Sequence, residues 1–223
     1  GKANTVVRVD ERSMSFTALG ASLKTNKPTA MIVTSGTAVA NLHPAMLEAH
    51  HAGISLIALT ADRPVRLRGK GANQTTLQPG IFDARLVDFV DVQSAEDIPL
   101  AKQKLITAIE NNQPLQINVC FDEPLSASPE PSKYLEKIEF SEKAISPREI
   151  DCSVKGVVIA GAGSDGAREF AEKANWPLFA EPSSGERFGS NVVLNYAELL
   201  NTALADQIEK VVVFGKPTLN RSV

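Results

Sequence analysis

The chain has 223 residues, of which 43% are apolar, and this composition is typical of a globular protein with one large or two small domains. Lysine and arginine total 23 against 26 aspartate and glutamate, so the formal charge of −3 offers no basic field for nucleic acid. All apolar runs fall short of the roughly 20 residues that a membrane-spanning helix needs. Together with two cysteines outside any CxxC pair and a start unlike a signal peptide, these features predict a cytoplasmic protein.

The chain begins with a short apolar stretch followed by an acidic pair. Residues 8–20 read RVDERSMSFTALG, and Asp10 and Glu11 stand where a strand at 5–9 should end and a helix begin. Acidic residues are favoured there because the helical peptide dipoles leave partial positive charge at the amino end, and Asp is a good N-cap. From the residues alone, capping and chemistry both remain open for the pair, and capping is the simpler interpretation.

Apolar, β-rich runs then alternate with stretches whose apolar residues recur at helical spacing. Strands are predicted at 5–9, 30–34, 55–60, 86–92 and 115–121, and helices at 12–25, 37–52 and 96–112. Such apolar runs are typical of a buried, mainly parallel sheet, and the alternation of strand and helix is typical of the α/β class.

Residues 122–147 are rich in proline, serine and glutamate without a sustained period, which predicts a connection between two domains. A second α/β unit follows this connection. Its predicted strands lie at 155–163, 177–181 and 210–215, and its predicted helices lie near 165–174 and 196–206. Because three parallel strands rarely stand alone and the first strand begins almost at Gly1, we expect the chain to be part of a longer polypeptide.

A glycine-rich turn opens the second unit. Gly161, Gly163 and Gly166 form a GxGxxG pattern after a strand, and Glu181 ends the next strand. This spacing fits a dinucleotide site, in which the glycines let the backbone approach a pyrophosphate and the acid binds the ribose. The competing interpretation is that any tight turn between strand and helix favours glycine. An NAD-binding oxidoreductase therefore remains one alternative.

Ser35, Gly36 and Thr37 form a turn of small residues between a predicted strand and a predicted helix. Backbone N–H groups at such a turn could hold an anion. No lysine follows the glycine, so the turn is not a P-loop. We interpret this segment as positioning structure that lines a site.

A cationic loop follows the strand predicted at 55–60. Its charged residues are the single acid Asp62 and the bases Arg63, Arg66, Arg68 and Lys70, and it continues into the amides Asn73 and Gln74. Loops at the carboxyl ends of parallel strands are where α/β proteins place their sites. The planar arginine fork grips a carboxylate through two hydrogen bonds. If the loop is a binding site rather than a solvated surface, its ligand should be an organic acid.

Six segments, in this order, carry a resemblance to a known family: DERSMSFTALG, TSGTAVAN, LTADRP, GANQTT, FDEPL and AEPSSG. They resemble the 2-succinyl-5-enolpyruvyl-6-hydroxy-3-cyclohexene-1-carboxylate synthases, thiamine-diphosphate-dependent enzymes of menaquinone biosynthesis. The resemblance implies a pyrimidine-binding domain at 1–128 without its opening segment, a linker at 129–150 and part of a Rossmann-like central domain at 151–223. The family's third domain holds the cofactor diphosphate through Mg²⁺ or manganese and has no counterpart here, so no metal ligand is expected in this chain.

The same resemblance implies roles for single residues. Glu11 matches the glutamate that hydrogen-bonds the aminopyrimidine ring of thiamine diphosphate and activates the cofactor, which leaves Asp10 as the cap. The residues expected to line the cofactor site are Ser35, Gly36 and Thr37, and those expected to meet the substrates are Arg63, Asn73 and Gln74.

The implied reaction decarboxylates 2-oxoglutarate and adds the resulting four-carbon carbanion to isochorismate. Both substrates are dicarboxylates, in agreement with the cationic loop. The family works as a homodimer or tetramer with active sites shared between subunits, so we expect this chain alone to be inactive. Two further alternatives remain open besides the oxidoreductase: a thiamine-dependent carboligase of the acetolactate synthase type, and a non-catalytic binding and dimerisation module.

Two arginines of the second unit have no role in this reaction. Arg187 and Arg221 follow the strands that end at Glu181 and Gly215, at the carboxyl edge of the predicted sheet. Such an edge is a natural crevice in α/β proteins. We therefore expect Arg187 and Arg221 to form a regulatory site for an acidic ligand, such as a later intermediate of the same pathway.

Overall fold

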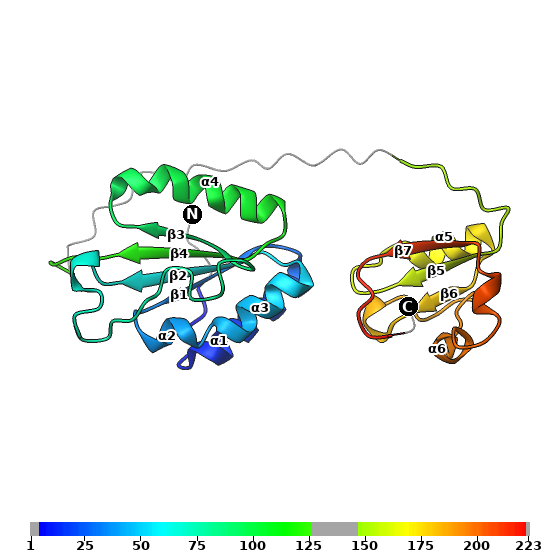
Figure 1. Ribbon diagram of the computed structural model, residues 1–223, viewed down its shortest axis with the longest axis horizontal. Coiled ribbons are helices and arrows are strands. Elements are labelled where there is room, and N and C mark those ends of the chain that lie inside the picture. Colours follow the sequence, from blue (N-terminus) through cyan, green and yellow to red (C-terminus); the bar gives the residue numbers. More distant parts are fainter. Residues whose placement is uncertain (1–4, 126–146, 222–223) are drawn as a thin grey trace. The chain divides into compact units, whose positions relative to one another are not determined.

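The computed structural model describes residues 5–125 and 147–221. The chain divides into two compact units, Gly1–Glu142 and Lys143–Val223, and each is described by itself (Figure 1). The division falls within the linker predicted at 129–150, of which residues 129–146 lie outside the described part of the chain.

The first unit is built on a four-stranded parallel sheet. Its strands are β1 (Thr29–Val33), β2 (Leu56–Asp62), β3 (Asp88–Val92) and β4 (Leu115–Cys120), in the order β1-β2-β4-β3. The predicted α/β class with a parallel sheet is therefore confirmed. Because β4 is inserted between β2 and β3, the carboxyl ends of these three strands meet at one edge.

Helices cover both faces of this sheet (Figure 1). One face packs against α1 (Glu11–Thr25), α2 (Thr37–Ala40) and α3 (His43–Ala52), and the other packs against α4 (Ile98–Glu110). Strand β2 serves both cores, because Leu56 and Ala58 point to the first and Ile57 and Leu59 to the second. Short 3-10 turns at Val65–Leu67 and Ala95–Asp97 follow β2 and precede α4.

Two predicted elements of this unit differ in the structure. The strand predicted at 5–9 is not formed, and Val6, Val7 and Val9 are exposed without a neighbouring strand to pair with. The helix predicted at 37–52 is broken into α2 and α3, with Pro44 in the first turn of α3. Proline lacks the N–H that would continue the hydrogen-bond ladder but fits the first turn of a new helix.

Helix α1 begins with the acidic pair. Asp10 has extended backbone angles and its carboxylate accepts a hydrogen bond of 2.7 Å from the N–H of Ser13, so it is the N-cap. Glu11 is the first helical residue and is half-buried. At the other end, Asn26 adopts the left-handed conformation that commonly closes a helix. The capping role of Asp10 is therefore confirmed, and the cap leaves the Glu11 carboxylate free for another task.

The second unit has a three-stranded parallel sheet. Its elements are β5 (Gly156–Ala160), α5 (Ala167–Ala174), β6 (Leu178–Ala180), a 3-10 turn at Pro182–Ser184, α6 (Tyr196–Leu199), a 3-10 turn at Ala205–Gln207 and β7 (Lys210–Phe214), with strand order β6-β5-β7. The helix predicted at 196–206 is thus wrong in length, since only its first turn is α-helical. Its middle contains Asn201 and Thr202, which bond back to the backbone of Ala197 and Leu199.

No helix in the two described stretches combines the length and apolar character that crossing a bilayer requires.

We predict that Asp10→Ala lowers the free energy of unfolding of the first unit by about 1 kcal/mol, because the N–H of Ser13 loses its acceptor at a helix end. Asp10→Ser should keep most of the stability, because serine also caps helices. Denaturant unfolding monitored by circular dichroism measures both variants. Equal losses in the two variants would contradict a capping role.

Candidate functional site

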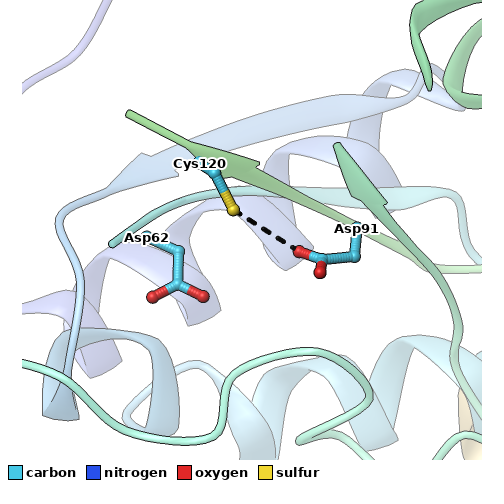
Figure 2. Close-up of side chains that lie close together, drawn as sticks. All are labelled: Asp62, Asp91 and Cys120. Carbon is cyan, nitrogen blue, oxygen red and sulfur yellow. Dashed lines mark hydrogen bonds between the residues drawn. The ribbon is translucent and has the colours of Figure 1, made fainter. Parts of the chain in front are cut away.

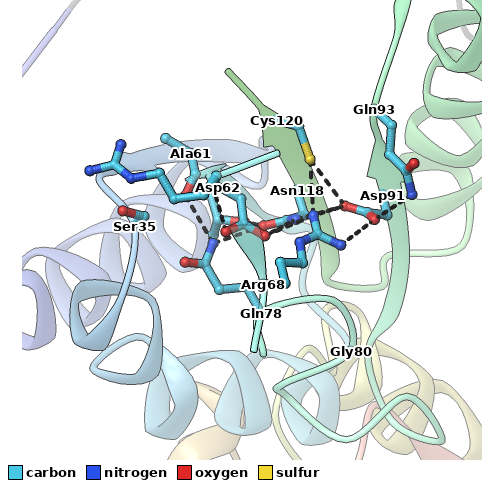
Figure 3. Close-up of polar contacts among 12 residues, drawn as sticks. Ser35, Ala61, Asp62, Arg68, Gln78, Gly80, Asp91, Gln93, Asn118 and Cys120 are labelled. Atoms are coloured by element: carbon cyan, nitrogen blue, oxygen red, sulfur yellow. Dashed lines mark hydrogen bonds and ion pairs between the residues drawn. The ribbon is translucent and has the colours of Figure 1, made fainter. Parts of the chain in front are cut away.

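Polar side chains gather where β2, β3 and β4 end in the first unit (Figure 3). Four of them, Thr60, Asp62, Gln78 and Asn118, are buried although they are polar or charged, and so is Gln116 near the start of β4. Buried polar groups are costly unless they are hydrogen-bonded, and each of these has at least one partner. The carboxyl edge of this sheet is therefore a built polar site rather than a solvated rim.

Arg68 is the centre of the charged part of this site. Its guanidinium pairs with Asp91 through two bonds of 2.7 and 2.9 Å and lies 2.8 Å from a carboxylate oxygen of Asp62. The side chain of Arg68 is only 12% exposed and that of Asp62 is fully buried. We call Asp62, Arg68 and Asp91 the ion cluster.

The ion cluster corrects the interpretation of the cationic loop. Arg68 does not offer its charge to a ligand, because two carboxylates already neutralise it. Asp62 is the single acid within the loop itself, whereas Asp91 comes from another strand, β3. The run LVDFVDV carries two carboxylates, Asp88 and Asp91, and an acid near the end of an apolar strand was the signal that could have identified Asp91.

The pKa of the Asp91 carboxyl is held below its ordinary value. Burial alone would raise this pKa, but hydrogen bonds from Arg68, Asn118 and Gln93 together outweigh the burial. The pKa of the Cys120 thiol moves the other way, to about 11, chiefly because of burial. At neutral pH, Asp91 is therefore ionised and Cys120 is a neutral thiol.

Asp62, Asp91 and Cys120 have the donor types of a metal site and lie within 4.8 Å of one another (Figure 2). The guanidinium of Arg68 occupies this position instead, with one nitrogen 2.9 Å from the Cys120 sulfur and 2.8 Å from Asp62. The three donors thus surround an internal cation, the guanidinium of Arg68.

The expected cofactor turn and the expected substrate loop are in direct contact. The Ser35 hydroxyl donates to the carbonyl of Gln74 at 2.8 Å, and the Gln74 amide donates to Thr34 Oγ1 and the Ser35 carbonyl, both at 3.0 Å. Gly36 has a φ of 82°, and a Cβ there would lie 3.1 Å from Gln74 Cγ. Glycine is therefore required at position 36 by both its conformation and its close neighbour.

One expectation for this turn is wrong. The N–H of Gly36 is not exposed for an anion, because it donates to Gln78 Oε1 at 2.7 Å and both residues are buried. The N–H groups of Thr37 and Ala38, at the start of α2, remain without an intrahelical acceptor.

Arg63 and Asn73 line a cavity of about 400 Å³ beside the ends of β2 and β4. Arg66 and Asp122 also line it and form an exposed ion pair. The Arg63 side chain makes no ion pair with any described residue, so its charge is available to a ligand. Gln74 lies outside this lining and belongs to the contact with Ser35.

Glu11 stands apart from these groups in the first turn of α1. It is half-buried, and its carboxylate makes no hydrogen bond or ion pair within the described part of the chain. Among the predicted site residues, the structure therefore pairs Arg63 with Asn73 and Ser35 with Gln74.

The glycine turn of the second unit serves the protein's own backbone. A Cβ at Gly161 would lie 2.1 Å from the carbonyl carbon of Lys216, and Ala162 exchanges backbone hydrogen bonds with Lys216. The buried carboxylate of Glu181 accepts from the N–H groups of Thr218 and Leu219 at 3.0 and 2.7 Å. Gly161 and Glu181 are thus both engaged by the chain's own backbone, which weakens the oxidoreductase alternative, whereas Gly163 and Gly166 have open space beside them.

Arg187 and Arg221 are both exposed in the second unit. Arg221 follows the segment Thr218–Asn220 that Glu181 holds through backbone N–H groups. Neither arginine makes an ion pair with a described residue, so both charges face solvent.

We predict that Arg68→Met lowers the free energy of unfolding by about 3–5 kcal/mol at neutral pH, because the buried carboxylate of Asp62 and the partly buried carboxylate of Asp91 lose their cation. The deficit should shrink in acid. Asp91 has a lowered pKa in the folded wild type, so its stabilising contribution is present above its unfolded pKa and is lost as the pH falls.

Arg66→Met is the matched control for this prediction. The Arg66–Asp122 pair has side chains 60% and 54% exposed, and such pairs contribute little. Chemical unfolding at several pH values compares the variants. A deficit of Arg68→Met that is small, or that does not change between neutral pH and about pH 3, below the ordinary pKa of an aspartate, would contradict the role of the ion cluster.

Comparison with known proteins relates the chain to a family of enzymes. Residues 2–84 match the family described as thiamine pyrophosphate enzyme, N-terminal TPP binding domain. The chain is also similar to proteins named 2-succinyl-5-enolpyruvyl-6-hydroxy-3-cyclohexene-1-carboxylate synthase. Identity is 44% with the Nocardioides sp. protein over 97% of this chain and 42% with the Renibacterium salmoninarum protein over 99% of this chain. Identity with the Leifsonia xyli protein is 40% over 100% of this chain.

The chain spans about two-fifths of the length of these relatives, namely 38%, 42% and 41%. The resemblance carried by the sequence motifs is therefore confirmed: over nearly its whole length the chain is homologous to part of the 2-succinyl-5-enolpyruvyl-6-hydroxy-3-cyclohexene-1-carboxylate synthases, and residues 2–84 match the N-terminal domain of thiamine pyrophosphate enzymes.

Proposed function

We propose that the protein takes part in the thiamine-diphosphate-dependent decarboxylation of 2-oxoglutarate and addition of the four-carbon product to isochorismate, a step of menaquinone biosynthesis. The observation that carries the proposal is the similarity to the synthases over nearly the whole chain. The site adds support, since a cofactor turn and a cavity with an unpaired arginine adjoin the same sheet edge.

Glu11 is the residue proposed to activate the cofactor. When bound, thiamine diphosphate supplies the electron sink for decarboxylation of a 2-oxo acid. The Glu11 carboxyl would hold a proton at the aminopyrimidine ring nitrogen, a task that needs a partly desolvated carboxyl with no competing partner. Its half-buried position and its lack of a partner among the described residues suit this role.

Arg63 and Asn73 are proposed to bind the acidic substrates in the cavity that they line. Arginine offers a two-bond grip on a carboxylate, and the Asn73 amide adds a neutral donor and acceptor. Gln74 contacts the Ser35 carbonyl instead, so we propose that it acts at the boundary between substrate and cofactor.

Several features of the complete protein follow from the same proposal. Residues 1–128 would act as the pyrimidine-binding domain, 129–150 as a linker and 151–223 as part of the central domain. Mg²⁺ would be held by a diphosphate-binding domain outside this chain, and a homodimer or tetramer would share its active sites. We propose a cytoplasmic location, and that this chain alone is inactive.

We predict that Glu11→Gln lowers turnover of the complete gene product by about 10²–10⁴-fold, because the proton at the cofactor ring is no longer held. Arg63→Met should instead raise the KM for the acidic substrates, by about tenfold for the loss of one charged contact. Product formation from 2-oxoglutarate and isochorismate, with thiamine diphosphate and Mg²⁺ present, measures both. Turnover of Glu11→Gln equal to that of the wild type would contradict the proposal.

Arg187 and Arg221 are proposed to bind an acidic regulatory ligand formed later in the same pathway. Two exposed arginines without ion pairs to described residues support this proposal. We expect Arg221→Ala to weaken inhibition by such a metabolite several-fold, as read from inhibition curves of the complete protein. Equal inhibition of wild type and variant would count against the site.

A further inference from the structure

Asn118 lies on β4 between the two carboxylates of the ion cluster. Its amide nitrogen donates to Asp62 at 2.9 Å and to Asp91 at 2.7 Å. Ionised carboxylates only accept hydrogen bonds, so this amide has one permitted orientation. Its oxygen must point away from the cluster, where it accepts from the Thr60 hydroxyl at 2.8 Å and from the Gln78 amide at 3.0 Å.

The orientation of the Asn118 amide fixes the orientation of the Gln78 amide. Its amide nitrogen faces two acceptors, the Asn118 oxygen and the carbonyl of Ala61 at 2.9 Å, so its own oxygen must face the other way. There it accepts the N–H of Gly36 at 2.7 Å. Gln78 is fully buried, so water does not compete for these bonds.

The backbone of Gln78 is held as firmly as its side chain. Its carbonyl accepts from the amide of Gln116 on β4 at 2.8 Å, and the Gln116 oxygen accepts from the N–H of Gly80 at 3.1 Å. The loop that carries Gln74 and Gln78 is thus attached to the sheet at one end and to the Ser35–Gly36 turn along its length.

We infer that Asn118 and Gln78 form an orientation relay that locks the Ser35–Gly36 turn and the loop at 73–80 into one unit, and that Gln78 is a positioning residue for cofactor binding. The inference rests on the proposed function for the assignment of the turn to the cofactor. In this arrangement the ion cluster fixes the Ser35–Gly36 turn indirectly, through the side-chain amides of Asn118 and Gln78.

The relay depends on the polarity of Gln78 and not only on its volume. Gln78→Glu keeps the shape and keeps an oxygen toward Gly36, but it replaces the donor nitrogen by an ionised oxygen that faces the Asn118 oxygen and the Ala61 carbonyl. Protonation of the new carboxyl at low pH restores a donor at that position. The defect should therefore be strong at high pH and weak at low pH.

The charged groups near Gln78 do not account for the expected pH dependence of the Gln78→Glu defect. Through Asn118, Gln78 lies near Asp62, Asp91 and Arg68 of the ion cluster, and the same strand ends also carry Arg63 and the neutral thiol of Cys120. The Asp91 carboxyl has a lowered pKa and an arginine stays charged throughout, so neither titrates at mildly acidic to neutral pH. Gln103→Glu on the exposed face of α4 makes the same change of charge and is the matched control.

The experiment uses the complete gene product and two measurements. Amide hydrogen exchange, without cofactor, follows residues 34–37 and 73–80, and titration with thiamine diphosphate and Mg²⁺ gives the affinity of the folded protein. In Gln78→Glu at pH 8 we expect both segments to exchange faster together and cofactor affinity to fall about tenfold or more. At pH 5.5 both effects should shrink, and Gln103→Glu should match the wild type at both pH values.

Faster exchange in only one of the two segments, or an affinity loss that is the same at both pH values, would overturn the relay. If Gln78→Glu does not fold at pH 8, Gln78→Asn replaces it, because the shorter amide keeps the polarity and withdraws it from Gly36. Normal cofactor affinity of the folded Gln78→Asn protein would then overturn the inference. Exchange changes as expected, combined with unchanged turnover in Glu11→Gln, would instead reject the proposed function and leave the relay intact.

Discussion

The guanidinium of Arg68 between Asp62 and Asp91 is the interaction on which the site depends. The two carboxylates come from β2 and β3, which are not neighbours, because β4 lies between them. Arg68 therefore ties three strands together at their carboxyl ends. A buried pair of this kind adds little net stability, but removing its cation leaves uncompensated charge and is costly. The cluster is better understood as a device that fixes positions than as a source of stability.

The same interaction shapes what the cationic loop offers to a ligand. Asp62 and Arg68 bracket the loop, and the Asp62 carboxylate also accepts the N–H of Arg63 at 2.7 Å. The loop is thereby closed on itself, and Arg63 and Arg66 face the cavity. With Arg68 neutralised and Arg66 shared with Asp122, the available charge is smaller than the sequence suggests. A single arginine, Arg63, beside the amide of Asn73 suits a specific contact with one carboxylate better than a diffuse cationic surface does.

The sequence predicted best those elements whose pattern is decided locally. Strands β1 to β4 and helix α4 appear where apolar runs and helical spacing placed them. The strand expected at 5–9 failed because a strand needs a partner, and its valines are exposed. The ion cluster was not predictable from the loop alone, since it unites Arg68 with a residue 23 positions away through a strand order that sequence spacing does not show. Arg63 and Asn73 were brought together as expected, but Gln74 was not placed with them.

Two glycine turns show why residue type alone could not separate structure from function. Gly36 and Gly161 both follow parallel strands, and both permit a close approach that a Cβ would obstruct. In each case the close neighbour is the protein itself, Gln74 in one and the backbone of Lys216 in the other. What distinguishes the turns is the use of the polar groups around them. In the second unit the Glu181 carboxylate is consumed by backbone N–H groups. In the first unit, Gly36 is hydrogen-bonded to Gln78, Gln78 to Asn118, and Asn118 to Asp91 of the ion cluster. The cavity lined by Arg63 lies at the same edge of the sheet. A glycine turn therefore does not by itself indicate a ligand site, and the group with unused bonding capacity in the first unit is Arg63, which lines the cavity and makes no ion pair with a described residue.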